Sequence, residues 1–177
     1  MDITQFVDRS IGQWRSQRSV HHLAFRHFEE VISTIDILPL VLDDPEVIKL
    51  CQTHNIDCQT ISRPFRMSWQ GESDWDEEEK VEGSTILVPV PDRDSPRQGR
   101  LLRDQGYAET IPAIGRYQIG EDGVFVLLTE YDRAMAEERI WFASEHIRFR
   151  VSLIKTSQGS GVTTASFSSE IRSLKNT

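Results

Sequence analysis

The sequence predicts a mostly β domain, either an up-and-down antiparallel barrel or a sandwich, with about ten short strands. Three observations support this. Beyond residue 58 nearly every segment is rich in β-branched and aromatic residues or alternates polar with apolar ones. Turn signals separate these segments at 92–99, 121–123 and 159–161. The length of 177 residues suits one domain, and we find no linker or internal repeat, so we expect a single domain over residues 1–177.

Two helices are expected in the first third of the chain. In "ITQFVDRSIG", residues 3–12, Ile3, Phe6 and Val7 fall on one side of a short helix, which Gly12 ends. A longer helix near 44–54 follows from "DDPEVIKLCQTHN", with an aspartate as cap and a proline in the first turn. From the spacing of the apolar residues, its inner face is expected to carry Val47, Ile48 and Cys51.

The strands are expected in regular succession. In the third of them, Phe65, Met67 and Trp69 share one face. The expected strand segments are 13–24, 28–40, 60–71, 81–92, 99–105, 110–119, 123–133, 136–146, 147–156 and 162–173.

Composition excludes several classes of function. The net charge of −8 argues against nonspecific nucleic-acid binding, which needs a basic surface. No apolar run approaches the roughly 20 residues that span a bilayer, so no membrane partner is expected. The first residues, "MDITQFVDRS", lack the features of a signal peptide, and we expect an intracellular protein.

No metal site is expected. Cys51 and Cys58 are separated by six residues, which is not a zinc pattern, and the five histidines form no ligand motif. Cys51 follows the apolar helical spacing, so a buried structural thiol is the favoured interpretation.

Polar residues occur in segments that otherwise resemble strands. "WRSQRSVHHLAF", residues 14–25, carries two arginines and two histidines. A barrel of eight to ten strands can hold one small ligand, and a wall facing it can be polar if the ligand satisfies the polar groups. An anionic ligand would suit the arginines. Strict alternation puts His22 on the side of Arg18 and His21 on the other.

A second such segment is "IRFRVS". Arg148, Arg150 and Ser152 share one face, and two arginines at this spacing suit carboxylates or phosphates. The alternative, favoured by the pattern alone, is a solvated outer face with Phe149 and Val151 turned inward.

These segments together resemble a known family. "WRSQRSVHHLAF" followed by "FEE", then "W…DW", "ERIWFAS" and "RFRVS", is similar in order and content to the S-type phycobiliprotein bilin lyases, from the first helix to about residue 173. The resemblance implies a lipocalin-like barrel, also similar to fatty-acid-binding proteins, of about ten strands with a helix. It also implies attachment of a linear tetrapyrrole to a cysteine of a phycobiliprotein subunit.

The resemblance implies roles for particular residues. Cations and a hydroxyl would hold the propionates, aromatic walls would contact the pyrrole rings, and carboxylates or histidines would handle protons. The expected pigment-binding residues are Arg18, Trp69, Trp75, Trp141, Arg148, Arg150 and Ser152, and the expected catalytic residues are Glu138, Glu170, His21 and His22.

The resemblance also implies partners. We expect a phycobilin, phycocyanobilin or phycoerythrobilin, as substrate, with no tightly bound cofactor. The expected protein partner is an apo-phycobiliprotein α or β subunit, in the cyanobacterial cytoplasm or plastid stroma, and a homodimer through outer strand faces is a further expectation. The alternative function is a noncatalytic, lipocalin-like carrier or chaperone of a bilin or another small anion.

Overall fold

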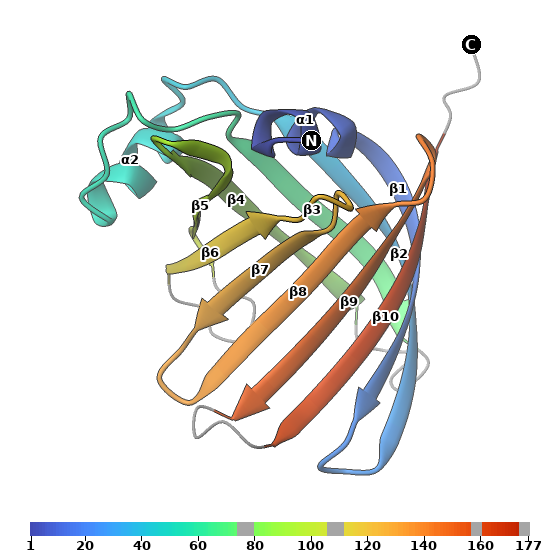
Figure 1. Ribbon diagram of the computed structural model, residues 1–177. Helices are drawn as coiled ribbons and strands as arrows, with labels where there is room; N and C mark the ends of the chain where they lie inside the picture. The colour runs from blue at the N-terminus through green and yellow to red at the C-terminus, as the bar shows by residue number, and fades with distance from the viewer. Residues whose placement is uncertain (74–79, 106–111, 157–160, 174–177) are drawn as a thin grey trace.

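The structure is a computed structural model that describes residues 1–73, 80–105, 112–156 and 161–173. Its strands form a closed antiparallel barrel in which each strand pairs with its neighbours in sequence and the last strand returns to the first (Figure 1). The elements are α1 (Ile3–Ser10), β1 (Gly12–His22), β2 (His27–Pro39), α2 (Pro45–Thr53), β3 (Phe65–Ser73), β4 (Lys80–Asp92), β5 (Ser95–Arg103), β6 (Ala113–Ile119), β7 (Phe125–Glu130), β8 (Ala134–Phe142), β9 (Ile147–Thr156) and β10 (Val162–Arg172).

The predicted fold class is confirmed: the described chain is a ten-stranded up-and-down barrel with two helices near the expected positions. Several boundaries differ from the expected ones: β3 begins at Phe65 instead of residue 60, and β8 ends at Phe142 instead of residue 146. Another difference concerns the loop expected at 92–99. β5 begins at Ser95, and Asp92 pairs with Ser95, so this connection is a tight turn.

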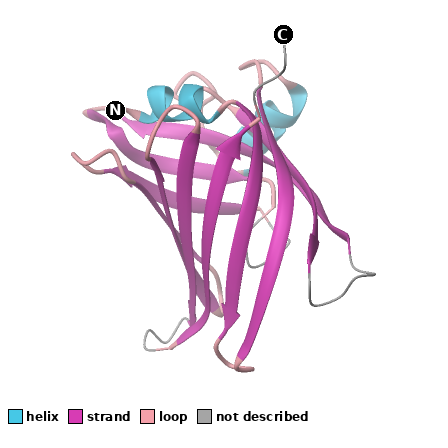
Figure 2. Cartoon of the chain, turned by 90° about the vertical axis from the view of Figure 1, so that its right-hand side faces the viewer, coloured by secondary structure: helices cyan, strands magenta, loops and turns pink. Residues whose placement is uncertain are grey.

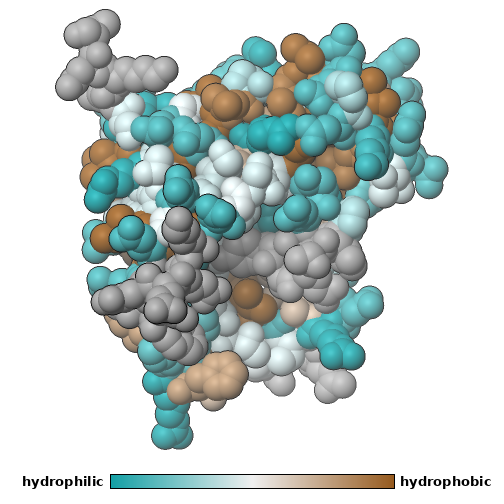
Figure 3. All heavy atoms as spheres, turned by 180° about the vertical axis from the view of Figure 1, so that it is seen from behind, coloured by the Kyte–Doolittle hydropathy of each residue, from teal (hydrophilic) through white to brown (hydrophobic). Residues whose placement is uncertain are grey.

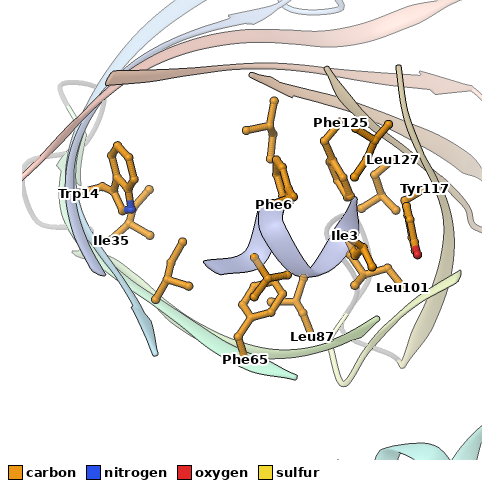
Figure 4. Close-up of a cluster of buried hydrophobic side chains, with 14 residues drawn as sticks. Ile3, Phe6, Trp14, Ile35, Phe65, Leu87, Leu101, Tyr117, Phe125 and Leu127 are labelled. Atoms are coloured by element: carbon orange, nitrogen blue, oxygen red, sulfur yellow. The ribbon is translucent and has the colours of Figure 1, made fainter. Parts of the chain in front are cut away.

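Helix α1 closes one end of the barrel. Its side chains Ile3, Phe6 and Val7 are buried, as the sequence predicts. Ile3 and Phe6 lie within the ring of strands (Figure 4). Phe6 stacks on Phe125 of β7 with ring centroids 4.4 Å apart. Asp2 caps the helix through a reciprocal capping box with Gln5, which fixes where the helix begins. The strands run from this closed end to the connecting loops at the opposite end (Figure 2).

Helix α2 packs on the outside of the barrel, against β4 and β5. Asp44 caps it and Pro45 occupies its first turn, as expected. Val47 and Cys51 are buried as predicted, but Leu50 completes the inner face in place of Ile48. Burial raises the pKa of the Cys51 thiol to about 12, so this group stays protonated and inert at neutral pH.

The surface combines hydrophilic residues with separate apolar patches. On the face seen in Figure 3, apolar residues lie among hydrophilic ones at the end that carries the helices. Leu38, near the end of β2, and Val41, just after that strand, are 57% and 64% exposed. No described helix has the length and apolar character that a membrane span requires.

Candidate functional site

A cavity of about 440 Å³ occupies the barrel beyond α1, within the range of small-molecule sites. Its two sides differ in chemistry. The side formed by β1, β9 and β10 is polar and contains Ser16, Arg18, His22, Arg150, Ser152, Ser166, Ser168 and Glu170. The side formed by β2, β3 and β4 is mainly apolar and contains Val31, Ile35, Met67, Trp69 and Val81.

Short side chains on the polar side leave the space that makes the cavity. Ser168 pairs across the sheet with both Arg18 and Arg150, and Ser16 pairs with Glu170. A serine contributes a hydroxyl but little volume, so each long charged side chain has a small neighbour on the adjacent strand. The polar groups can therefore extend along the wall without filling the lumen.

An ion-pair network lies at the inner part of the polar side. Arg148 donates from Nε to Glu170, and Arg150 Nε lies 3.4 Å from Oε1 of the same carboxylate. Arg150 Nη1 also lies 3.6 Å from Glu138 Oε1, and Arg103 Nη2 lies 3.2 Å from Glu138 Oε2. Arg103 belongs to β5 and Glu138 to β8, which β6 and β7 separate along the wall, so this contact spans the barrel interior.

Glu170 and Arg148 of this network are charged at neutral pH. Burial raises the pKa of the Glu170 carboxyl, but Arg150, Arg148 and Arg18 outweigh it and hold that pKa below its usual range. Burial lowers the pKa of Arg148 to about 10, which still leaves the guanidinium protonated near pH 7. Glu170 is therefore an ionised hydrogen-bond acceptor rather than an acid with a proton to give.

The described network carries more positive than negative charge. Four guanidinium groups, those of Arg18, Arg103, Arg148 and Arg150, lie around the carboxylates of Glu138 and Glu170. Glu29 at the rim also lines the cavity, so arginines outnumber carboxylates there by four to three. Within the described chain, Arg18 Nε, Arg103 Nε and Ser152 Oγ are buried without a hydrogen-bond partner. Leaving buried polar groups unsatisfied is costly, so the arrangement fits an anionic ligand with further hydrogen-bond acceptors.

Six of the expected site residues line the cavity. They are Arg18, His22, Trp69, Arg150, Ser152 and Glu170. Trp69 packs directly on Gly83, its cross-strand partner, where an added Cβ would lie 2.3 Å from the indole ring. A glycine at this position is what allows the ring to sit close to β4.

The structure resolves the choice between the two histidines. His22 faces the cavity on the side of Arg18, as strict alternation predicts, and its Nε2 lies 2.9 Å from Glu29 Oε2 near the open end. His21 points outward and is exposed, with its ring 5.0 Å from that of Phe28.

Several expectations about side-chain direction require correction. Trp141 lies on the outer face, because β8 turns Glu138 and Ile140 inward, and its ring is 5.6 Å from that of Phe149. The interpretation of Arg148, Arg150 and Ser152 as a solvated outer face is wrong, since all three point inward.

Two expected site residues lie inside the barrel but beneath the cavity surface. Glu138 and Arg148 are almost fully buried and are not among the residues that line the cavity. Arg148 also lies over the ring of Trp14, 4.4 Å from its centroid. Trp75 lies outside the described residues.

Arg103 is a site residue that the sequence analysis missed. It is 5% exposed and lines the cavity. The available signal was its position two residues after Leu101 in "GRLLRDQ", since an inward Leu101 requires Arg103 to point inward as well.

Comparison with known proteins gives consistent matches over nearly the whole chain. The family model described as CpeS-like protein matches residues 2–173. Chromophore lyase CpcS/CpeS 3 of Trichodesmium erythraeum is 62% identical over 173 residues, which cover 98% of this chain and all of that protein. Chromophore lyase CpcS/CpeS of Thermosynechococcus vestitus is 48% identical over 172 residues, which cover 97% of this chain and 93% of that protein.

A solved structure extends the match to three dimensions. The S-type phycobiliprotein lyase CPES from Guillardia theta superimposes with a TM-score of 0.87 at 48% identity, covering 99% of this chain and 95% of that one.

Proposed function

The chain belongs to the CpeS-like family, and we propose that it is a phycobiliprotein chromophore lyase, which binds a phycobilin and attaches it to a cysteine of a phycobiliprotein subunit. The observation that carries the proposal is the cavity, in which arginines outnumber carboxylates and Trp69 lies on the opposite, mainly apolar side. A phycobilin has two propionates and a curved conjugated system, so its charge and its rings match the two sides of the cavity.

We assign pigment contacts to the residues that line the cavity. Arg18 and Arg150 would hold the propionates, and Ser152 would donate a further hydrogen bond. Trp69 would lie against a pyrrole ring on the apolar side. Glu170 would accept hydrogen bonds from pyrrole N–H groups, since it is ionised and reaches the cavity surface.

The proposed reaction is the addition of a thiol to the ethylidene double bond of the pigment's A ring. The cysteine sulfur bonds to the exocyclic carbon, the ring carbon gains the hydrogen, and nothing leaves, so no oxidant or reductant is needed. Holding the pigment in one orientation contributes to the rate. An ionised Glu170 stabilises a protonated, positively charged pigment, whose ethylidene is more electrophilic, and His22 at the rim would take the thiol proton.

Some residues of the ion-pair network would act by positioning others. Arg148 holds Glu170, and Arg103 holds Glu138, which in turn contacts Arg150. Because Arg148 does not line the cavity, we assign it this role instead of the direct propionate contact that the sequence analysis expected.

We extend the proposal to the pigment, the protein acceptor, the cellular location and the oligomeric state. We propose phycocyanobilin or phycoerythrobilin as the pigment, used as a substrate and not retained, and an apo-phycobiliprotein α or β subunit as the acceptor. We also propose that the protein acts in the cytoplasm or plastid stroma and pairs with a second copy through its outer face.

Coexpression with apo-phycobiliprotein subunits and a bilin supply tests the function. With the native protein, we expect the subunit to become coloured, and we expect this colour to survive denaturation. Glu170→Gln should still bind the pigment but should attach it about 10²-fold more slowly or worse. Colour that is reversible and stays on this chain alone would support the noncatalytic carrier. Native attachment by both Glu170→Gln and Glu138→Gln would contradict the roles of these carboxylates.

A further inference from the structure

The hairpin that joins β1 to β2 carries an exposed apolar tip. Residues 23–26, "LAFR", which we call the mouth hairpin, include Leu23 at 49% and Phe25 at 78% exposure. Hairpin turns favour Gly, Asn, Asp and Ser, which solvate well and adopt left-handed conformations. Here the left-handed position is taken by Arg26, with φ of 51°, and the remaining positions are apolar. Turn formation alone does not account for such a sequence.

The mouth hairpin is held in place by the rest of the barrel. Leu23 donates its backbone N–H to the carbonyl oxygen of Thr163 in β10, at 2.9 Å. Phe25 N–H donates to His22 O at 3.1 Å, which closes the turn. The apolar side chains are therefore presented on an ordered support, which lowers the entropy cost of contact with a partner.

The mouth hairpin directly adjoins the rim of the cavity. His22 and Glu29, on the two strands that carry it, both line the cavity and contact each other at 2.9 Å. Figure 1 places this hairpin at the end of the barrel opposite α1. Any protein whose cysteine reaches a pigment in the cavity through this end must come close to Leu23 and Phe25.

We propose that the mouth hairpin is a docking element for the acceptor, an apo-phycobiliprotein subunit with an apolar surface beside its acceptor cysteine. The proposal rests on the lyase function above. The acceptor is the occupant that the geometry favours, because a second copy seated on this hairpin would obstruct the opening that the thiol must use. Leu23 and Phe25 become buried only in the transfer complex, and separation of the product exposes them again.

The test compares Leu23→Ser/Phe25→Ser with Val41→Ser, which removes a similarly exposed apolar side chain at the opposite end of the barrel. Pigment affinity is measured by absorbance titration, and attachment rate is measured against apo-subunit concentration. We expect native pigment affinity in both variants. The hairpin variant should need about tenfold more apo-subunit for half-maximal rate, since removal of an aromatic interface anchor has an effect of this order. Val41→Ser should behave as the native protein does.

Direct binding of labelled apo-subunit separates this proposal from the lyase function. If the native protein binds the subunit without attaching pigment, the lyase function fails, while loss of binding in the hairpin variant still supports docking. An unchanged subunit affinity and rate in the hairpin variant would overturn the proposal. A change in the oligomeric state of the free protein on Leu23→Ser/Phe25→Ser, seen by sedimentation, would also overturn it in favour of a second copy.

Discussion

Glu170 shows how a buried carboxylate can remain ionised inside this barrel. Its side chain is 1% exposed, which opposes ionisation, but two arginines from β9 reach its two oxygens. The carboxylate, in turn, balances Arg148, which is equally buried. Removing either member of this pair would leave a buried charge without its partner, a change that typically costs about 3–5 kcal/mol.

The pH dependence of stability follows from the sign of the Glu170 shift. Because the folded pKa lies below the unfolded value of about 4.3, its contribution is complete above that pH and is lost as pH falls through the folded pKa. We predict that Glu170→Gln lowers the free energy of unfolding by about 3–5 kcal/mol at pH 7. The difference from the native protein should shrink below about pH 4.3, as measured by chemical denaturation across a pH series.

Glu137→Gln provides the matched control. Glu137 lies on β8 and is paired with Arg139 and Lys155, but it faces outward and these partners are more exposed. Its loss should cost about 0–1 kcal/mol because solvent screens such pairs. Equal losses for Glu137→Gln and Glu170→Gln at pH 7 would contradict the role of the buried pair.

Strands β9 and β10 reverse the usual distribution of polar and apolar residues. Their inward positions carry arginines, serines and a glutamate, while the outward positions from Ile147 to Leu153 and from Ala165 to Ile171 carry no charge. We call these outward residues the outer apolar face: Ile147, Phe149, Val151, Leu153, Ala165, Phe167, Ser169 and Ile171. Phe149 and Phe167 stack there with centroids 5.8 Å apart, and Phe167 is 45% exposed. This is the surface that we assign to the proposed homodimer.

A charge placed on the outer apolar face should separate the two copies. We predict that Phe167→Glu shifts the protein to a monomer in sedimentation velocity and leaves pigment affinity native, because the side chain points away from the cavity. Val41→Ser, which alters a surface at the other end, should leave the oligomeric state unchanged. A native protein that is monomeric at micromolar concentration would contradict the homodimer.

The reversed distribution of polar and apolar residues in β9 and β10 also explains which side-chain directions could be predicted from the sequence. Alternation along β1 gave the direction of His22 correctly because Trp14 and Val20 fix the inward side. In β9 one face is apolar and the other carries Arg148, Arg150 and Ser152, so the pattern alone favours the apolar face inside, and the structure has the opposite. The observed direction depends on Arg103 and Glu138, which meet the arginine face from other strands. Trp141 was misplaced for the same reason, since apolar character predicts burial and this barrel has an apolar outside.

At the scale of the whole molecule, the main apolar core and the binding cavity lie at opposite ends of the barrel. The end closed by α1 holds the main apolar core, including Ile3, Phe6 and Trp14. The other end has a cavity with excess positive charge in the described residues. A dianionic ligand should therefore stabilise the folded state through the charges it neutralises as well as through contact area.

Thermal unfolding in the presence of pigment tests this idea. At about 100 times the dissociation constant, a phycobilin should add about 2.7 kcal/mol of stability, which corresponds to a Tm rise of about 5–10 °C for a chain of this size. The dimethyl ester at the same concentration should give a smaller rise, because it has lost both carboxylates. In Arg150→Gln the two pigments should differ less. Identical shifts for acid and ester in the native protein would rule out charge recognition.

The closed ring formed when β10 pairs with β1 also limits how partners can be recognised. Each described strand has a hydrogen-bonded neighbour on both sides, so the ring offers no free backbone edge on which another chain could add a strand. Selection among acceptors must then depend on side chains and connecting loops. Such positions can change without altering strand register, so a few surface substitutions could redirect the same pigment site to a different subunit.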